Sequence, residues 1–363
     1  MIEPRPELSK LSDYVPGKSI EEIRERYNLN SVVKLASNEN PLGASPKAVE
    51  AFHRIADSLH LYPRGDAPKL IDAIAQKYGV NKNQIIIGNG SDEIIDMVGK
   101  AFIRKGDNCI AITPTFSVYK FTTLSNGADF IGVAEDNTQT GLANLAAAIN
   151  DKTRVVFICN PNNPTGFYYT ETEIRDFLGK VPKNVLVFLD EAYAEFATAP
   201  DFPELEGALD EFPNLFINRT FSKIYGLAGL RVGYAMANES VIKAMWKIKP
   251  PFDVNQAAQA AAIAAFADEE HVKATRENNA KGSRFLFDNL IGFNFKVLPT
   301  QANFRCVRVG ERAPEMVSFL EKNGMIIRGL TSFGMPEYVR ITIGKPEENE
   351  LLVALVKKWK EGV

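Results

Sequence analysis

Residues 218–234 read N-R-T-F-S-K-I-Y-G-L-A-G-L-R-V-G-Y, and they place one lysine next to two residues with hydroxyl groups. Lys223 is flanked by Thr220 and Ser222, and Arg231 follows eight residues later. A lysine amine can form a Schiff base with an aldehyde, whereas arginine and hydroxyl donors suit a phosphate group. One short loop could therefore hold an aldehyde at one end and a phosphate at the other.

Pyridoxal 5'-phosphate (PLP) is the common cofactor that carries both groups, so this stretch suggests a PLP site. Most lysines, however, are solvated surface charges, and a serine–lysine pair near an arginine is common. The hypothesis therefore depends on what the rest of the chain supplies.

The composition is that of an ordinary globular protein. A chain of 363 residues is long enough for two domains of about 150 residues each. The net charge of −3 offers no basic face for nucleic acid or an anionic membrane. No apolar run approaches the length of about 18 residues that a membrane span needs. We expect a cytoplasmic protein without nucleic-acid or membrane partners.

The cysteines and histidines indicate neither a disulfide framework nor a metal site. Cys109, Cys159 and Cys306 lie far apart in apolar runs, with no C-x-x-C spacing. An odd number of cysteines in strand-like runs is typical of buried thiols in a reducing compartment. The three histidines are also widely separated, so we expect no metal.

Apolar strand-like runs alternate with amphipathic helical runs through the first two thirds of the chain. This order indicates an α/β fold with a mostly parallel sheet covered by helices on both faces. Ligands of such sheets bind at the carboxyl ends of the strands. The expected strands lie at residues 84–88, 108–113, 129–134 and 154–159, with two more that end at Asp190 and Thr220.

The last third of the chain has a different pattern. We expect a helix from Tyr234 through Lys247, and Pro250 and Pro251 then indicate a bend between domains. The short strands and helices that follow are typical of a smaller α+β domain. The expected organisation is an N-terminal arm with part of the small domain at 1–44, a large PLP-binding domain at 45–250 and a small domain at 251–363.

Two of the expected strands end in loops that carry polar groups suited to a ligand. At residues 88–93, G-N-G-S-D-E leads from a strand into a helix, and a helix N-terminus attracts anions. Glu93 replaces the third glycine of a dinucleotide fingerprint, so an NAD site is disfavoured. Ser91 as a simple helix N-cap is the alternative. The loop N-P-N-N-P-T-G at 160–166 is rigid enough to present an amide to a ligand.

Charged residues within apolar strands need partners. Asp190 closes an apolar strand, where a carboxylate is unfavourable unless it meets a cation; a helix cap or loop ion pair is the alternative. Arg328 and Arg340 lie in the apolar runs M-I-I-R-G and Y-V-R-I-T-I-G. Each needs an anion, which could be a protein carboxylate or an acidic substrate.

Six motifs in register resemble those of the fold type I PLP-dependent aminotransferases over nearly the whole chain. Among these enzymes, the motifs look most like those of the histidinol-phosphate aminotransferases. They are N-E-N-P-L-G, G-N-G-S-D-E, P-N-N-P-T-G, D-E-A-Y, T-F-S-K-I-Y-G-L-A-G-L-R-V-G-Y and V-R-I-T-I-G.

The resemblance implies a role for each residue of the cofactor site. Lys223 matches the lysine that forms the Schiff base, and Asp190 matches the aspartate that pairs with the pyridinium nitrogen. Tyr193 and Asn163 match donors to the ring oxygen, and Phe116 matches the aromatic residue that stacks on the ring, where the family often has tyrosine. The implied phosphate cup consists of Ser91, Asp92, Thr220, Ser222 and Arg231.

The resemblance also implies a homodimer and a substrate site. Tyr62 matches a tyrosine that contacts the phosphate in the neighbouring subunit's site. Arg340 matches the arginine that binds the carboxylate of glutamate or 2-oxoglutarate, and Asn163 lies at the border of cofactor and substrate. Arg328 and Tyr14 match groups that hold the substrate's phosphate.

The implied reaction is a ping-pong transamination of L-histidinol phosphate with 2-oxoglutarate, in histidine biosynthesis. The products are imidazole-acetol phosphate and glutamate, and Lys223 moves the proton between substrate and cofactor. Three alternatives remain open: an aromatic amino acid aminotransferase, a phosphothreonine-type decarboxylase and a PLP-binding regulator without turnover. The first would not require Arg328, and the second would need no keto acid.

Overall fold

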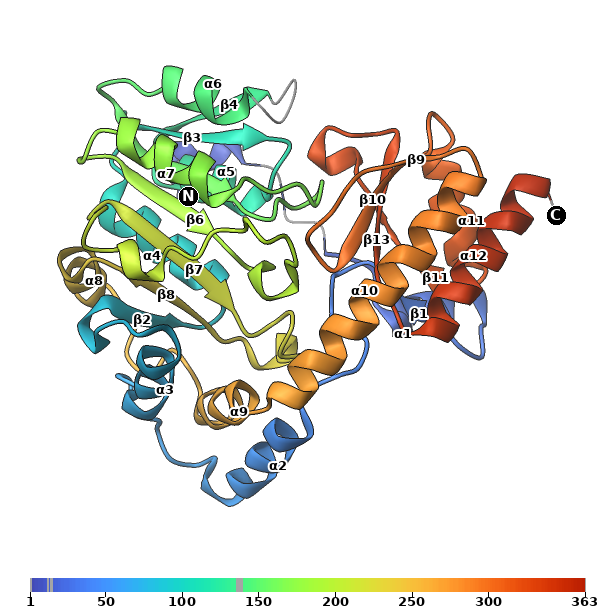
Figure 1. Cartoon of the computed structure of the whole chain (residues 1–363), viewed down its shortest axis with the longest axis horizontal. Helices are drawn as coiled ribbons and strands as arrows, with labels where there is room; N and C mark the ends of the chain where they lie inside the picture. Colours follow the sequence, from blue (N-terminus) through green and yellow to red (C-terminus); the bar gives the residue numbers. More distant parts are fainter. Residues whose placement is uncertain (1, 12, 14–15, 135–139, 363) are drawn as a thin grey trace.

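The computed structural model describes residues 2–11, 13, 16–134 and 140–362. Its larger sheet has seven strands in the order β2-β8-β7-β6-β5-β3-β4 (Figure 1). Strand β8 runs antiparallel to both neighbours, and all other neighbouring pairs are parallel. The strands are β2 (Ile85–Gly88), β3 (Asn108–Thr113), β4 (Asp129–Ala134), β5 (Thr153–Cys159), β6 (Leu186–Asp190), β7 (Leu215–Thr220) and β8 (Gly233–Ala237).

This arrangement confirms the predicted α/β fold, but the sequence did not reveal β8. We expected Tyr234 to lead directly into a helix, whereas residues 233–237 form a strand between β2 and β7. The run G-Y-A-M-A is short, apolar and fully buried, and such a run shows neither helical nor strand periodicity. The helix begins only at Glu239.

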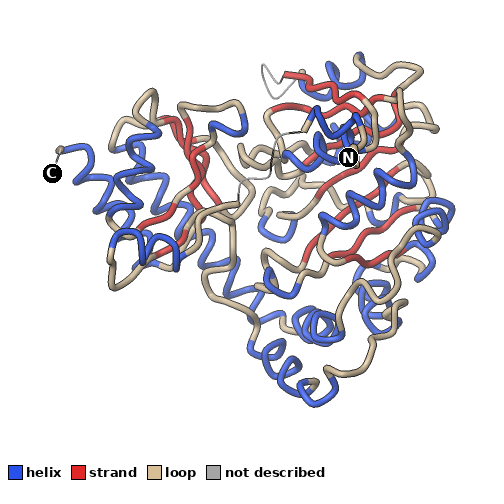
Figure 2. The backbone as a smooth tube through the Cα atoms, turned by 180° about the vertical axis from the view of Figure 1, so that it is seen from behind, coloured by secondary structure: helices blue, strands red, loops and turns tan. Residues whose placement is uncertain are grey.

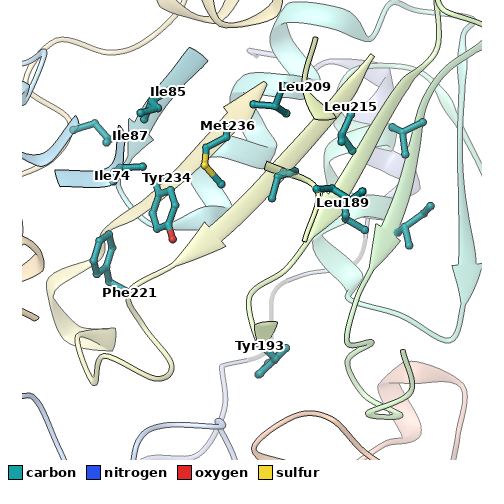
Figure 3. Packing of buried hydrophobic residues seen from close by; sticks show 14 of the residues in the cluster. Ile74, Ile85, Ile87, Leu189, Tyr193, Leu209, Leu215, Phe221, Tyr234 and Met236 are labelled. Carbon is teal, nitrogen blue, oxygen red and sulfur yellow. The ribbon is translucent and has the colours of Figure 1, made fainter. Parts of the chain in front are cut away.

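Two apolar layers cover the two faces of the large sheet. Successive residues of a strand point to opposite faces, so Ile85 and Ile87 join one layer and Ile86 the other. Side chains from neighbouring strands fill the first layer together, as Figure 3 shows for Ile85, Met236, Leu215 and Leu189. The surrounding helices are α2 (Pro46–Arg54), α3 (Pro68–Tyr78), α4 (Ser91–Phe102), α5 (Ser117–Ser125), α6 (Gly141–Ala147), α7 (Glu171–Lys180), α8 (Glu239–Trp246) and α9 (Gln256–Phe266).

A smaller antiparallel sheet lies beside the large one, in the order β12-β13-β10-β9 (Figure 2). A separate two-stranded sheet pairs β1, near the N-terminus, with β11, and Leu35 packs into the same core as Leu286 and Trp359. Residues from both ends of the chain therefore build this region. Its elements are α1 (Ile20–Tyr27), β1 (Val33–Lys34), α10 (Glu269–Gly292), β9 (Lys296–Val297), β10 (Phe304–Arg308), α11 (Ala313–Lys322), β11 (Met325–Ile326), β12 (Arg328–Gly329), β13 (Tyr338–Thr342) and α12 (Pro346–Glu361).

Helix α10 connects the two regions (Figure 1). Helix α9, which precedes it, packs its alanines and Phe266 into the core of the large sheet. The side chains of α10 that pack into or against the small core begin at Phe285. The domain boundary at residue 250 stays a prediction. Short 3-10 turns complete the fold at Pro6–Lys10, Ala56–Ser58, Lys82–Gln84, Ala194–Phe196, Glu206–Ala208, Ala228–Leu230 and Thr331–Phe333.

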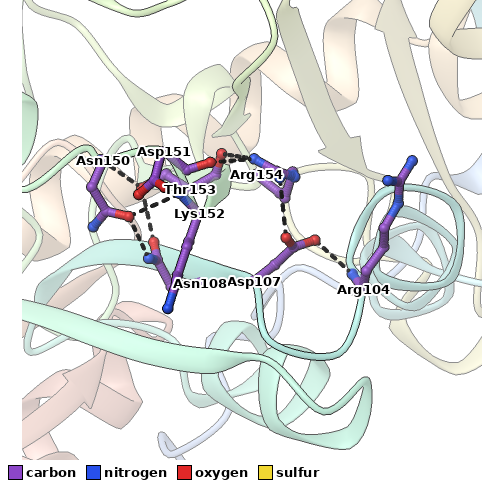
Figure 4. A network of polar contacts seen from close by, with 8 residues as sticks. All are labelled: Arg104, Asp107, Asn108, Asn150, Asp151, Lys152, Thr153 and Arg154. Atoms are coloured by element: carbon purple, nitrogen blue, oxygen red, sulfur yellow. Dashed lines mark hydrogen bonds and ion pairs between the residues drawn. The ribbon is translucent and has the colours of Figure 1, made fainter.

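Polar contacts tie the amino ends of β3 and β5 together (Figure 4). The Asn108 amide donates to Asn150 at 2.9 Å, and the Thr153 hydroxyl donates to Asn108 at 2.8 Å. Asp107 forms an ion pair with Arg154 at 3.2 Å. These contacts close one end of the sheet and leave the carboxyl ends for a ligand. None of the helices in the described ranges has both the length and the apolar character to cross a membrane.

Candidate active site

Asp190 lies at the carboxyl end of β6 and is 3% exposed. Its oxygens accept hydrogen bonds from the Tyr119 hydroxyl at 2.6 Å, the Asn218 amide at 3.2 Å and the Ala192 N–H at 3.3 Å. Burial raises the pKa of Asp190 to about 6, although these hydrogen bonds oppose the shift. No lysine or arginine of the described residues forms an ion pair with it, so the alternative of a loop ion pair is not supported.

Lys223 follows β7 in a loop that packs closely on the N-terminal segment. Its ammonium donates to the Ser37 carbonyl at 3.0 Å. Gly226 has a φ of +70°, and a Cβ there would lie 2.1 Å from the Gly43 carbonyl oxygen, so only glycine permits this approach. Burial, and then the positive charge of Arg340, lower the pKa of Lys223 to about 8. A large fraction of this amine is therefore neutral near pH 8.

Tyr193 and Asn163 connect the site to the small sheet. The Asn38 amide donates to the Tyr193 hydroxyl at 2.9 Å, and burial raises the pKa of Tyr193 to about 12. The Asn163 side-chain oxygen accepts from the Arg340 guanidinium. Residues from the N-terminal segment, the large sheet and the small sheet thus meet at one place.

The residues of the predicted phosphate cup lie together at the start of α4. Gly90 occupies the N-cap position and α4 begins at Ser91. The alternative that Ser91 is a simple N-cap is therefore wrong. Arg231 donates to the Ser222 hydroxyl and pairs with Asp92, each at 3.4 Å. A Cβ on Gly90 would lie 2.5 Å from the Arg231 guanidinium, so the backbone there closely lines the cup.

The fifth member of the cup, Thr220, accepts from the Ser222 N–H at 3.1 Å. Phe116 stands directly before α5, with its ring edge-to-face with Tyr119 at 5.7 Å. Tyr62 lies apart from this group: it is 82% exposed and stacks on Phe252 at 4.7 Å. The five residues of the predicted cup therefore lie close together in the structure, and their role as phosphate ligands stays a prediction. Tyr62 faces solvent in this single chain.

Arg328 and Arg340 are direct partners across strands β12 and β13. Arg340 is 6% exposed, donates to the Ala36 carbonyl at 2.7 Å and leaves its Nε without a partner. No carboxylate of the described residues pairs with either arginine, so the alternative of a protein partner is not supported. Tyr14, the other predicted phosphate ligand, lies outside the described residues.

The residues present fit PLP. Asp190 is a buried carboxylate without a cation, which a protonated ring nitrogen would supply. The cup offers hydroxyl groups, a guanidinium and the first N–H groups of α4 to a phosphate. Lys223 has a lowered pKa, as a nucleophilic amine requires. The described ranges hold no group of three or more metal-binding side chains.

Three contributing residues were not predicted: Asn38, Tyr119 and Asn218. Asn38 is the first residue of the motif N-E-N-P-L-G, and it has a left-handed φ of 56°. Tyr119 follows Phe116 by three residues, which places both on one side of α5. Asn218 lies two residues before Thr220 in the same strand. Only the assembled fold shows that Tyr119 and Asn218 meet Asp190.

Comparisons with known proteins agree with this geometry. The family described as aminotransferase class I and II matches residues 30–356. Histidinol-phosphate aminotransferase of Brevibacillus brevis is 41% identical over 361 residues, covering 99% of each chain. That of Moorella thermoacetica is 42% identical over 355 residues, covering 98% of this chain and 92% of the relative. The crystal structure of the Sinorhizobium meliloti enzyme in complex with PLP has a TM-score of 0.90 at 26% identity, covering 98% and 97% of the two chains.

Proposed function

This chain belongs to the class I and II aminotransferases, and we propose that it transfers the amino group of L-histidinol phosphate to 2-oxoglutarate with PLP as cofactor. Relatives named for this activity are 41% to 42% identical over almost the whole chain. The reaction yields imidazole-acetol phosphate and glutamate, a step of histidine biosynthesis. The residues that carry it are proposed below.

The observation that carries the proposal is the pair of adjacent arginines, neither of which pairs with a carboxylate among the residues that the structure describes. The substrates of this reaction bear anions at different positions: a phosphate on histidinol phosphate and two carboxylates on 2-oxoglutarate. Arg340, buried and held by Asn163 and Ala36, is rigid enough to bind a carboxylate. Arg328 is half-buried on the neighbouring strand and can bind the substrate's phosphate.

Each catalytic side chain has a distinct task. Bound PLP supplies an electron sink that stabilises negative charge on the amine-bearing carbon of the substrate. Lys223, whose pKa of about 8 leaves part of it neutral, would take the proton from that carbon and deliver one to the former aldehyde carbon of the cofactor. Asp190 would hold the ring nitrogen protonated by its charge. Tyr193 and Asn163 would donate to the ring oxygen, and Phe116 would lie against the ring.

We further propose a homodimer in which Tyr62 completes the partner's phosphate cup. The segment around Tyr62 exposes large apolar side chains to water: Leu59 is 63% exposed and Leu61 is 57% exposed. Contiguous exposed apolar surface is typical of an interface between chains. A second copy of the chain would cover it and give Tyr62 a buried position.

Replacement of Arg328 by glutamine tests the role of the arginine pair. Loss of a charge-assisted contact to phosphate is worth roughly 1.5–3 kcal/mol, so KM for histidinol phosphate should rise about 10- to 100-fold. KM for 2-oxoglutarate should change less than about threefold, since Arg340 remains. Arg312→Gln, at an exposed arginine paired with Glu315, is the matched control. An equal rise in both KM values would contradict the assignment of Arg328.

A further inference from the structure

Residues 248–254 connect α8 to α9 and contain a buried ion pair. Lys249 and Asp253 bond to each other, and each side chain is only 2% exposed. The Lys249 ammonium also donates to the Ile87 carbonyl at 2.8 Å, near the end of the edge strand β2. Buried charges are tolerated only where they are paired and hydrogen-bonded. This pair therefore fixes the connecting segment against the strand that leads to the phosphate cup.

Glu93 extends this cluster to the cup itself. Its carboxylate accepts from the Asn89 N–H at 2.6 Å, and Asn89 directly precedes Gly90, which lines the cup. Burial, and then the neighbouring Asp253, raise the pKa of Glu93, whereas the charge of Lys249 lowers it. Glu93 thus interacts with the connecting segment on one side and with the backbone of the cup on the other.

Phe252 lies between Lys249 and Asp253 in the sequence and, unlike those two side chains, is exposed. Its φ of 58° is in the left-handed region, which is unfavourable for a bulky side chain and persists only where neighbouring contacts impose it. Its ring, 47% exposed, stacks on Tyr62 at 4.7 Å with an interplanar angle of 24°. The buried ion pair of Lys249 and Asp253 therefore fixes the segment that carries Phe252, the ring on which Tyr62 stacks.

We infer that Glu93, Lys249 and Asp253, the Lys249 cluster, are positioning residues that couple the phosphate cup of a subunit to the Tyr62 it offers to its partner. The inference rests on the proposed function, because Tyr62 acts on a cofactor only in the dimer. Order imposed on one cup by a phosphate passes through Asn89 and Glu93 to the connecting segment and Phe252. The two sites of the dimer are thereby linked.

A double-mutant cycle on cofactor retention tests this coupling. The full-length protein is loaded with PLP, and the rate of PLP loss is followed by the cofactor's absorption while a scavenger binds free PLP. Glu93→Ala should speed the loss about tenfold, because the Asn89 N–H loses its acceptor. Glu93→Gln, whose amide oxygen can still accept, should stay within about twofold of the wild type. Phe252→Ala should speed the loss about fivefold by releasing Tyr62.

The double variant shows whether Glu93 and Phe252 act together on PLP retention or independently. If one coupled unit acts, Glu93→Ala with Phe252→Ala should lose PLP clearly less than about 50-fold faster, the product of the single effects. Multiplicative effects, or an unchanged rate in Glu93→Ala, would overturn the inference. Phe121→Ala, at an exposed phenylalanine on α5, is the control. Glu93→Asp replaces Glu93→Ala in the cycle if the latter does not fold. A wild-type chain that holds no PLP would instead refute the proposed function.

Discussion

At the scale of single residues, Asp190 shows a conflict between stability and function. Its folded-state pKa of about 6 exceeds the ordinary value of 3.8, so the folded, cofactor-free protein binds more protons than the unfolded chain between these values. Asp190 therefore contributes to the folding stability of the cofactor-free protein below about pH 4. This contribution is lost as the pH rises through about 6. A cation bound beside Asp190 would offset the unfavourable free energy of burying its charge. The same carboxylate can therefore serve as a ligand for a cationic cofactor.

Asp190→Asn should make the cofactor-free protein more stable at pH 7.5. The neutral amide removes the penalty of a buried charge, about 1–3 kcal/mol for a shift of this size. The same variant should bind PLP more weakly, because the ring nitrogen loses its partner. Thermal unfolding of the cofactor-free proteins at pH 4.5 and pH 7.5 measures the effect. A wild-type protein as stable as the variant at both pH values would show that Asp190 is not strained.

Tyr119→Phe isolates the hydrogen bond that supports Asp190. The phenyl ring keeps the stack on Phe157 at 4.7 Å, while the hydroxyl that lowers the pKa of Asp190 is lost. The pKa of Asp190 in the cofactor-free protein should rise further, so the pH range over which its thermal stability falls should move to higher pH in the profile of thermal stability against pH. Tyr168→Phe removes a similar bond to Asp201 at the surface and should leave the profile unchanged. Identical profiles for both variants would argue against a supporting role for Tyr119.

At the scale of elements, strands β6 and β7 are joined by a buried ion pair next to the site. Arg219 donates to Glu191 at 2.9 and 2.6 Å and pairs with Glu206 at 2.7 Å. Glu191 directly follows Asp190, and Arg219 directly precedes Thr220. Burial raises the pKa of Glu191 to about 7 although Arg219 opposes the shift. The pair holds the two strand ends that carry the catalytic residues.

Arg219→Ala should therefore destabilise the protein strongly. Removal of one partner leaves Glu191 buried without compensation, which costs about 3–5 kcal/mol. Arg175→Ala, which breaks a partly exposed pair with Glu171 on α7, should cost less than about 1 kcal/mol. Urea unfolding of both variants measures the difference. If both variants lost a similar amount of unfolding free energy, Glu191 would have to become solvated or protonated without destabilising the protein.

The elements also show which information the sequence contains. Continuous apolar strands such as β3 and β5 were predicted, because their patterns are local. Strand β8 was not, since its state depends on the neighbours β2 and β7. Lys223 and Asp190 stood out as residue types out of place in apolar strands and loops. Tyr119 and Asn38, which hydrogen-bond Asp190 and Tyr193, did not stand out in the sequence. A single hydroxyl or amide has no distinctive sequence pattern, and its partner is known only from the fold.

At the scale of the whole molecule, the exposed Tyr62 predicts that activity can be restored by mixing two defective variants. A Lys223→Ala dimer lacks the amine, and a Tyr62→Ala dimer lacks the phosphate contact. In a mixed dimer, the subunit with an intact Lys223 receives an intact Tyr62 from its partner. Random exchange of equal amounts should therefore restore about one quarter of the wild-type sites. Subunit exchange without any gain of activity would place Tyr62 in its own chain's site or outside the site.

The central claim is that the PLP-loaded protein accepts histidinol phosphate as its amino donor. The most direct measurement is a titration of the cofactor's visible absorption band with histidinol phosphate, and separately with phenylalanine, in the absence of keto acid. We expect histidinol phosphate to abolish the band at concentrations below about 1 mM, while phenylalanine leaves it intact. Loss of the band with phenylalanine alone would contradict the claim and move the protein to the aromatic amino acid aminotransferases.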